Sequence, residues 1–218
     1  MKDTKVSVGF YTCIAACAEL CKHKEMKRIA IFASGSGTNT VNLIEYFNKT
    51  FDKRVEVVCT NNPNAGVIER AEKAGVPVIV FTRQEWMETE KIGQKLVDEE
   101  IDLVVLAGFL WLVPPGFIRK FNRRIVNIHP ALLPKYGGKG MYGMNVHRAV
   151  LEHGEQESGI TIHYVNKEYD RGEIIFQARC PVYPDDTPER LAQRIHLLEY
   201  QHYPQVVEEL LDRINQSE

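Results

Sequence analysis

The segment that most constrains the fold is residues 102–107, Asp-Leu-Val-Val-Leu-Ala, in which every residue after the aspartate is apolar. A strand with one solvated face alternates apolar and polar residues, because successive side chains point to opposite faces. A run without that alternation indicates a strand buried on both faces, as in a parallel sheet covered by helices. The segment therefore predicts an interior strand of an α/β protein.

Strands and helices alternate on the N-terminal side of this segment. Apolar runs predict strands at 29–33, 54–59 and 76–81, and periodic apolar positions predict helices at 41–47 and 65–74. This alternation favours right-handed βαβ crossovers. We therefore expect a doubly wound, mostly parallel, Rossmann-like sheet.

The remaining segments complete the predicted fold. Residues 86–99 have the pattern of one charged amphipathic helix, and residues 160–165 and 172–182 alternate as an antiparallel strand pair would. Thr187 followed by Pro and Glu is typical of a helix start. A long C-terminal helix follows in the prediction, and Pro204 is expected to break or kink it.

The first candidate site is the turn Ser34-Gly-Ser-Gly-Thr-Asn39, which connects the first predicted strand to the first predicted helix. Backbone N–H groups at a helix N-terminus can hold an anion, and Gly35 and Gly37 permit its close approach. The turn is neither a Walker loop nor the full dinucleotide fingerprint. A tight turn without a ligand is therefore the alternative interpretation.

The second candidate site is the stretch Arg124-Ile-Val-Asn-Ile-His-Pro-Ala-Leu-Leu-Pro134. If its apolar part is a strand, Asn127 and His129 point to the same side. An amide donor beside a titratable imidazole could serve an acyl-type transition state, although a polar pair that satisfies local backbone groups is the alternative. The aromatic and apolar loop 108–115 follows another strand, and ligands of open α/β sheets bind beyond the carboxyl ends of strands.

Two further polar patterns are candidates for binding or catalysis. Asp170-Arg-Gly172 marks a tight turn, so Asp170 is either a turn former or a functional carboxylate. His196 and Glu199 are three residues apart on the predicted C-terminal helix and therefore share one face. That face either contacts a ligand or is simply solvated.

Composition excludes several function classes. The formal net charge of −2 gives no basic field to recruit nucleic acid or an anionic membrane, and no apolar run reaches the ~20 residues that span a bilayer. The five cysteines do not form a secreted disulfide pattern, so we expect a reducing cytoplasm. Residues 1–25 have the character of an N-terminal extension of unknown role ahead of a single domain, 26–218. The extension contains Cys13, Cys17 and Cys21, which lack a convincing fourth ligand, so no metal is expected.

Three stretches together resemble the folate-dependent formyltransferases. The Asn-x-His-Pro block with a later Asp-x-Gly is similar to the superfamily as a whole, and the early Gly-Ser-Gly-Thr-Asn turn is similar to its phosphoribosylglycinamide formyltransferase family. The likeness runs from Met26 almost to the end of the chain. The stretches are Ile31-Phe-Ala-Ser-Gly-Ser-Gly-Thr-Asn39, Asn127-Ile-His-Pro-Ala-Leu-Leu-Pro134 and Tyr164-Val-Asn-Lys-Glu-Tyr-Asp-Arg-Gly172.

The resemblance implies a reaction and its substrates. A formyl group would pass from 10-formyltetrahydrofolate, the formyl donor, to the amine of glycinamide ribonucleotide in de novo purine biosynthesis. The implied enzyme is a cytoplasmic monomer or weak homodimer that uses no metal and binds neither nucleic acid nor membrane. The main alternative is formyltetrahydrofolate deformylase, a hydrolase for whose regulatory domain 25 residues are too few. A methionyl-tRNA formyltransferase would need an additional C-terminal domain, and a non-catalytic nucleotide-binding module would leave the Asn-x-His-Pro block unexplained.

The resemblance also implies roles for three residues that match the family's catalytic trio. Asn127 would donate a hydrogen bond to the formyl oxygen as negative charge gathers there. His129, as imidazolium, would stabilise the same oxygen and assist proton transfer toward the departing folate nitrogen. Asp170 is expected to raise the pKa of His129, because a nearby opposite charge favours the protonated imidazole.

The binding residues implied by the resemblance fall into two groups. The ribonucleotide phosphate would be held at Gly37, Thr38 and Asn39, and the other end of that substrate at His196 and Glu199. The folate would lie on the loop after the interior strand, and a second loop would close over its pterin. The expected folate contacts are Arg83, Leu110, Trp111, Leu112, Val113, Asn127, Asn166 and Asp170.

Overall fold

The computed structural model describes residues 26–88 and 90–214. In the first part of the chain the elements are β1 (Lys27–Phe32), α2 (Thr38–Phe47), β2 (Lys53–Thr60), α3 (Val67–Lys73), β3 (Val78–Val80), α4 (Arg83–Met87), α5 (Lys91–Asp98), β4 (Leu103–Leu106), α6 (Pro115–Lys120) and β5 (Ile125–His129). They are followed by α7 (Met144–Glu152), β6 (Glu157–Tyr164), β7 (Ile174–Pro181) and α8 (Pro188–Ile214).

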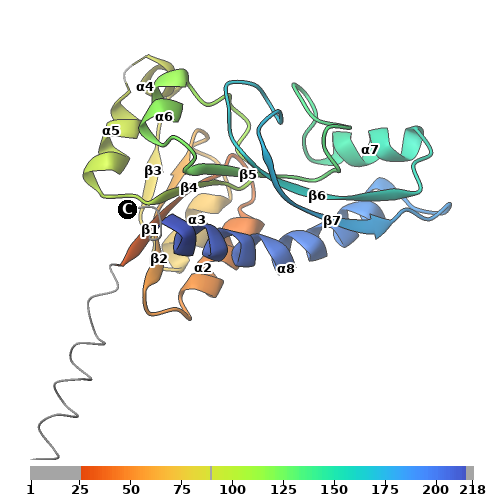
Figure 1. Cartoon of the computed structure of the whole chain (residues 1–218), viewed down its shortest axis with the longest axis horizontal. Helices are drawn as coiled ribbons and strands as arrows, with labels where there is room; N and C mark the ends of the chain where they lie inside the picture. Colours follow the sequence, from red (N-terminus) through yellow and green to blue (C-terminus); the bar gives the residue numbers. More distant parts are fainter. Residues whose placement is uncertain (1–25, 89, 215–218) are drawn as a thin grey trace, which may run out of the picture.

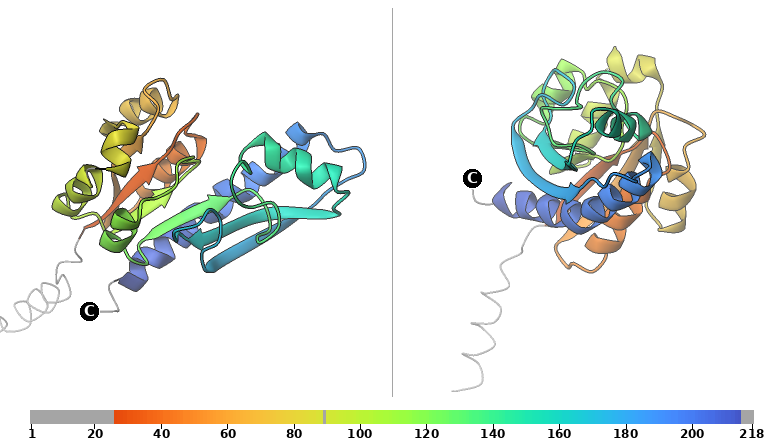
Figure 2. Two further views of the ribbon diagram at one scale, coloured as in Figure 1. Left: turned by 90° about the horizontal axis from the view of Figure 1, so that it is seen from above. Right: turned by 90° about the vertical axis from the view of Figure 1, so that its right-hand side faces the viewer.

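The strands of the described ranges form one sheet of seven, in the order β3-β2-β1-β4-β5-β6-β7. The pairings from β3 through β5 are parallel, and those of β5 with β6 and of β6 with β7 are antiparallel. Helices lie on both sides of the sheet (Figures 1 and 2). The predicted doubly wound sheet, with its antiparallel C-terminal strands and long C-terminal helix, is confirmed.

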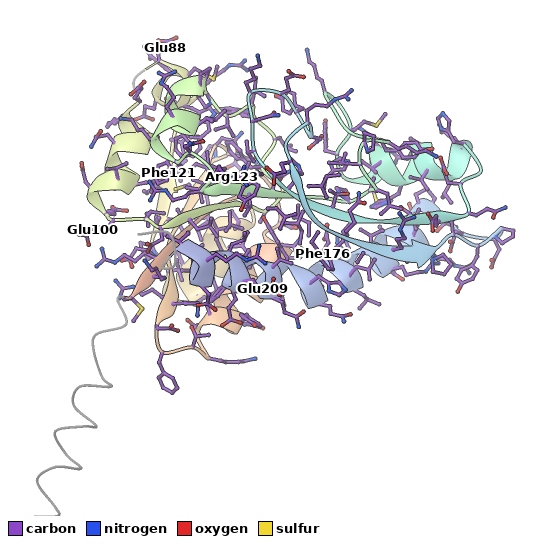
Figure 3. The ribbon with its side chains drawn as sticks, viewed as in Figure 1. Glu88, Glu100, Phe121, Arg123, Phe176 and Glu209 are labelled. Atoms are coloured by element: carbon purple, nitrogen blue, oxygen red, sulfur yellow. The ribbon has the colours of Figure 1, made fainter. Side chains whose placement is uncertain are left out.

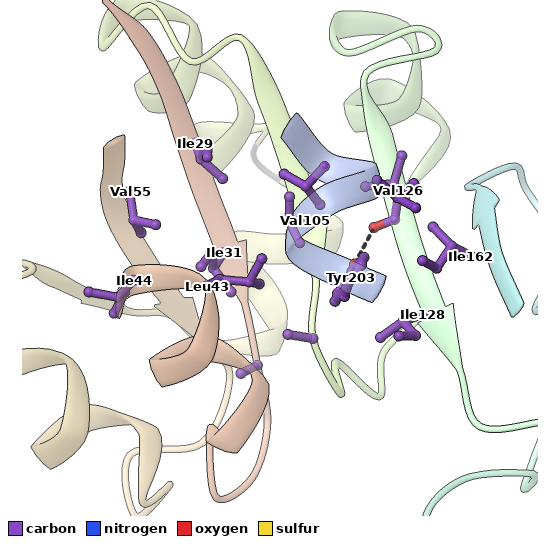
Figure 4. Close-up of a cluster of buried hydrophobic side chains, with 14 of the residues drawn as sticks. Ile29, Ile31, Leu43, Ile44, Val55, Val105, Val126, Ile128, Ile162 and Tyr203 are labelled. Carbon is purple, nitrogen blue, oxygen red and sulfur yellow. Dashed lines mark hydrogen bonds between the residues drawn. The ribbon is translucent and has the colours of Figure 1, made fainter. Parts of the chain in front are cut away.

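The interior strand β4 shows why the sheet is covered on both faces. Leu103 and Val105 pack into one core with side chains of α2, α3 and α8, part of which Figure 4 shows. Val104 and Leu106 point the other way, into a second core with α4, α5 and α6. All four side chains are buried. The uninterrupted apolar run thus supplies both cores, since neither face of this strand meets water.

The single helix predicted over 86–99 is wrong, because two helices occupy this region. Thr82 and Glu85 form a capping box that starts α4 three residues before Trp86. Glu90 then adopts a left-handed conformation with φ 48°, which lies outside the helical range and precedes the first residue of α5. The apolar periodicity was therefore a correct sign of helix, but it did not reveal the interruption.

Pro204 does not break α8, which runs without interruption from Pro188 to Ile214. Proline has no N–H, so the carbonyl of Tyr200 loses its usual partner four residues later. The side chain of Asn42 on α2 replaces that partner, donating from Nδ2 to the Tyr200 oxygen at 3.0 Å. The expectation of a break is wrong, because a contact from another helix satisfies the freed carbonyl.

Helix α8 is anchored at the edge where β4 and β5 end. The buried hydroxyl of Tyr203 donates to the carbonyl of Leu106 at 2.9 Å and lies 3.5 Å from the carbonyl of Val126 (Figure 4). On β7 the ring of Phe176 lies against α8, with its centroid 4.9 Å from that of His202 (Figure 3). These contacts fix the helix face that was predicted to bind substrate.

Several sequence predictions concern residues 1–25, including Cys13, Cys17 and Cys21, and these lie outside the described residues. Within 26–88 and 90–214, no helix has both the length and the apolar character to cross a membrane. No group of three His, Cys, Asp or Glu side chains in the same ranges is arranged to hold a metal ion.

Candidate active site

The structure brings Asn127, His129 and Asp170 together at the carboxyl end of β5. Asp170 comes from the loop between β6 and β7, and its Oδ1 lies 3.4 Å from Asn127 Nδ2. The same oxygen lies 3.6 Å from His129 Nδ1. We term these three residues, with His163 described below, the strand-end cluster. Asn127 and His129 face the same side of β5, so both can meet the one carboxylate.

The carboxylate of Asp170 is held by a tight turn. Asp170 has a left-handed backbone with φ 53°, and its Oδ2 accepts the N–H of Gly138 at 2.9 Å. A Cβ on Gly172 would lie 1.6 Å from the carbonyl oxygen of Tyr164, so only glycine fits there. The turn predicted from Asp-x-Gly therefore exists, and it is also what places the carboxylate in the cluster.

His163 belongs to the same cluster and was not identified from the sequence. It stands opposite Asn127 in the β5–β6 pairing, and its Nε2 lies 3.2 Å from Asn127 Nδ2. The same nitrogen is 3.7 Å from Asp170 Oδ1. The sequence showed only a titratable residue in a mostly apolar strand. The strand register was needed to show that this residue stands opposite Asn127.

The hydrogen bonds of His129 define its neutral form. Its Nε2 lies 2.8 Å from the carbonyl oxygen of Tyr136, which only accepts, so Nε2 carries the proton. A neutral imidazole has one N–H, and Nδ1 is therefore a bare acceptor that faces Asp170. A second proton on the ring would sit on Nδ1, beside the carboxylate.

The pKa of His129 is lowered from its ordinary value of 6.5, mainly because burial penalises the charged ring. Asp170 and the Tyr136 carbonyl raise the pKa, as opposite charge and an acceptor should, but they do not outweigh burial. The predicted direction of the Asp170 contribution is therefore correct, although burial decides the net direction. For Asp170, burial raises the pKa, but the nearby rings of His163 and His129 oppose it, leaving the pKa lowered.

The glycine turn at the start of α2 is built from backbone. Gly37 is the N-cap residue, with φ 78°, and no side chain caps the first turn of the helix. A Cβ on Gly37 would lie 2.4 Å from Cγ2 of Val67, so the turn packs directly against α3. Uncapped N–H groups at a helix N-terminus can hold an anion, so the phosphate site at this turn stays a prediction from the sequence.

The face of α8 predicted to contact substrate lies against this turn. Asn39 Nδ2 donates to Glu199 Oε2 at 2.9 Å, and His196 Nδ1 lies 2.8 Å from the same oxygen. Glu199 is 5% exposed, so the solvated-face alternative is wrong for this residue. The bond with Glu199 raises the pKa of His196 above 6.5. Two stretches that were predicted separately thus form one polar group.

His147 is a further buried histidine, on α7, that was not identified from the sequence. Its Nδ1 has no hydrogen-bond partner among the described residues. Burial and then the charge of His196 lower its pKa to about 4, while Glu199 raises it and His129 lowers it further.

The turn and the strand-end cluster lie at the same edge of the sheet. The turn follows β1 and the cluster lies at the end of β5, and the carboxyl ends of these parallel strands share one edge. His196 and Glu199 join that edge through Asn39, so the turn, α8 and β5 form one candidate site.

The loop after β4 is fixed from two sides. Trp86 Nε1 donates to the carbonyl of Leu112 at 2.9 Å, and the N–H of Leu110 donates to Ser34 Oγ at 3.0 Å. Leu110 is 43% exposed, whereas Val113 is buried in the second core. The loop is therefore partly core and partly open surface.

The other expected folate contacts lie on surrounding loops. The guanidinium of Arg83 is 5.8 Å from the ring centroid of Trp111, a cation–π distance. Asn166 bonds within its own loop, donating to the carbonyl of Arg171 and accepting from the N–H of Glu168. Across the described part of the chain, neither Arg83 nor Asn166 hydrogen-bonds the strand-end cluster.

Comparison with known proteins agrees with this arrangement. Residues 27–207 match the family model described as formyl transferase. A chloroplastic phosphoribosylglycinamide formyltransferase of Arabidopsis thaliana is 42% identical over 187 residues, which cover 83% of this chain and 64% of that protein. The chain thus spans less than two thirds of the length of this plant relative.

Two bacterial proteins are similar over most of their length. The phosphoribosylglycinamide formyltransferase of Haemophilus influenzae is 37% identical, with 84% of this chain and 86% of that protein covered. The solved structure of glycinamide ribonucleotide transformylase 1 from Symbiobacterium toebii is 34% identical, with a TM-score of 0.78 and coverage of 86% and 88%. The predicted resemblance is confirmed, and the chain belongs to the formyl transferase family, in its phosphoribosylglycinamide formyltransferase branch.

Proposed function

We propose that this protein transfers the formyl group of 10-formyltetrahydrofolate to the amine of glycinamide ribonucleotide, giving formylglycinamide ribonucleotide and tetrahydrofolate in purine biosynthesis. The observation that carries the proposal is the strand-end cluster, where an amide donor, an imidazole and a carboxylate meet at distances of 3.4 and 3.6 Å. An anion-binding turn belongs to the same site. The similarity to proteins named phosphoribosylglycinamide formyltransferase also supports the proposal.

Asn127 supplies the hydrogen bond that favours the transition state. Attack by the amine on the formyl carbon moves negative charge onto the formyl oxygen. The amino group of Asn127 donates to that oxygen, and such a donor is typically worth ~3 kcal/mol. Since the side chain sits at the end of a buried strand, little reorganisation accompanies the reaction.

His129 moves the proton. Its pKa is lowered, so the ring of the free protein is neutral near pH 7 and its bare Nδ1 can accept a proton from the attacking amine. Asp170 Oδ1, 3.6 Å away, then stabilises the imidazolium. The same proton passes from Nδ1 to the folate nitrogen as its bond to the formyl carbon breaks, which restores the neutral ring.

The turn and α8 hold the acceptor. The uncapped N–H groups of Gly37, Thr38 and Asn39 bind the phosphate, and Glu199 accepts hydrogen bonds from hydroxyl or amine groups at the other end. The folate lies along the loop after β4, with its exposed Leu110, and the loop that contains Asn166 closes over the pterin. The formyl donor is a substrate in this scheme.

The direct test is an assay of the purified full chain with both substrates. We expect formylglycinamide ribonucleotide, identified by mass, to appear at the rate at which folate absorbance changes. Omission of the ribonucleotide should abolish the absorbance change. Release of formate without an acceptor would instead support the deformylase, and absence of any change with both substrates would refute the proposal.

Three finer features of the proposed enzyme stay predictions from the sequence. They are a cytoplasmic location, a monomeric or weakly dimeric state, and independence from metals and nucleic acids. Gel filtration with light scattering tests the oligomeric state. Unchanged turnover after treatment with a chelator tests the independence from metals.

A further inference from the structure

His163 lies at the centre of the strand-end cluster, yet the proposed reaction gives it no step. Only 2% of its surface is exposed, and it stands opposite Asn127 in the pairing of β5 with β6. A buried imidazole is costly unless its polar nitrogens have partners. The partners of the two ring nitrogens therefore indicate what the ring does.

The two nitrogens of His163 have partners of opposite kind. Nδ1 lies 2.8 Å from the carbonyl oxygen of Tyr164, which only accepts, so Nδ1 carries the proton. In the neutral ring Nε2 is then a bare acceptor. It lies 3.2 Å from the side-chain amide of Asn127. The neutral form of this ring is thus the opposite tautomer to neutral His129, which carries its proton on Nε2.

This tautomer decides which way the Asn127 amide faces. Its amino group lies between two acceptors, His163 Nε2 at 3.2 Å and Asp170 Oδ1 at 3.4 Å. The reversed amide would direct its carbonyl oxygen at both of these acceptors. It would lose two hydrogen bonds and bring lone pairs of electrons to face one another. One N–H is engaged by His163, and the second makes the longer contact with Asp170. The second N–H is the one that a formyl oxygen would take.

We infer that His163 is a positioning residue that acts through Asn127, holding the amide with its amino group directed at the formyl oxygen. The expected effect on turnover rests on the proposed function, whereas the contact between His163 and Asn127 does not. Two packing features support the position of the ring. A Cβ on Gly172 would lie 3.3 Å from His163 Nδ1, and the Tyr164 carbonyl that accepts from Nδ1 is the one against which Gly172 packs.

Two substitutions separate the roles of the two nitrogens. His163→Gln places a side-chain oxygen near the position of Nε2 and so keeps an acceptor for Asn127. His163→Asn has a shorter side chain that keeps a donor near Nδ1 but has nothing at Nε2. Both variants remove the ring, but His163→Asn also leaves one methylene less than His163→Gln, so the thermal midpoint of each variant is measured to follow its loss of packing.

We expect kcat of His163→Asn to fall by about 10- to 100-fold, because misorienting a donor costs less than deleting it. His163→Gln should stay within about fivefold of the wild type, and KM for both substrates should change little in either variant. His163 lowers the pKa of His129, the group that sets the acid limb of the pH profile, so the limb should move to higher pH by the same amount in both variants. Equal kcat values for the two variants would overturn the inference, since only His163→Gln keeps an acceptor for Asn127.

A second measurement does not depend on turnover. Nitrogen-15 NMR of labelled full-length protein at about pH 8 reports which imidazole nitrogen is protonated. We expect His163 as the Nδ1–H tautomer, whose bare Nε2 accepts from the side-chain amide of Asn127. An Nε2–H tautomer would overturn the inference. If the wild type proved inactive with both substrates, the proposed function would fail while this spectrum still decided the contact.

Discussion

The two halves of the site use different chemical groups, namely backbone N–H groups in one half and side chains in the other. The turn at the start of α2 has no side-chain cap and presents N–H groups of the backbone. The strand-end cluster consists of side chains that meet across β5, β6 and the loop after β6. The first half belongs to the parallel part of the sheet and the second to the antiparallel extension. A backbone site tolerates side-chain changes that leave its path intact, whereas a side-chain site fails when one group is removed.

The largest expected effect is in the cluster. His129→Ala should lower kcat by about 1,000-fold, within the range for loss of a general acid–base group, because this ring carries the proton in the proposed reaction. KM for the ribonucleotide should change little, since the turn is untouched. Steady-state kinetics with both substrates would measure the two constants separately.

The same substitution elsewhere provides the control. His202→Ala removes a half-buried ring that packs on Phe176 of β7, outside the site, and should keep kcat within about threefold of the wild type. Near-normal turnover of folded His129→Ala would show that the cluster does not depend on this imidazole.

The next effect separates charge from hydrogen bonding within the cluster. Asp170→Asn should lower kcat by about 100-fold, because the imidazolium loses its counter-charge. The reaction needs neutral His129, so activity falls as pH drops through the pKa of this residue, which lies below 6.5. Asp170 raises that pKa, so its removal lowers it further, and the acid limb of kcat/KM should move to lower pH. A limb that stayed in place or moved upward would contradict the electrostatic role of Asp170.

The contrast between the halves also explains what could be read from the sequence. The turn was predicted together with its neighbouring strand and helix, because its glycines lie in one short stretch between two recognisable elements. The distant groups that also hydrogen-bond Ser34, from Gly108 and Leu110, could not be predicted in this way. The trio was found only through the family resemblance, because Asp170 is 43 residues from Asn127 and only the β6–β7 loop brings them together. His163 and His147 were missed, since strand register and helix packing, rather than any local pattern, determine where they lie.

Two outcomes that the sequence did not reveal have the same origin. Pro204 was expected to break or kink α8, but the helix is not broken, and Asn42 satisfies the Tyr200 carbonyl, 158 residues away, that proline leaves without a donor. Asp170 raises the pKa of His129 as expected, but burial, which the motif does not reveal, outweighs this contribution. In both cases the local chemistry was identified correctly, and a distant part of the chain determined the result.

The third prediction tests the backbone half through its path. Gly37→Ala introduces a Cβ 2.4 Å from Val67 Cγ2 and requires an alanine at φ 78°. We expect a loss of about 2–4 kcal/mol in the free energy of unfolding from overpacking and the left-handed backbone. KM for the ribonucleotide should rise about 10-fold with a smaller change in kcat, because the N–H groups move while the cluster does not.

Two variants sharpen this result. Gly35→Ala lies in the same turn but its Cβ would meet nothing within 4 Å, so it should match the wild type in the free energy of unfolding. Gly37→Ala combined with Val67→Ala should recover the steric part of the loss and leave the cost of the left-handed backbone. Equal effects of Gly35→Ala and Gly37→Ala would show that the clash with α3 is not what shapes the turn.

The smallest expected effect is the sharpest test of the contrast. Thr38 is the first residue of α2, and in the proposed site its N–H rather than its hydroxyl holds the phosphate. Thr38→Ala leaves that N–H in place and introduces a better helix former, so KM for the ribonucleotide should change less than about threefold. Isothermal titration with the ribonucleotide would measure the affinity directly. A loss of 10-fold or more would mean that the turn, like the strand-end cluster, depends on a side chain, and the distinction between the two halves would then fail.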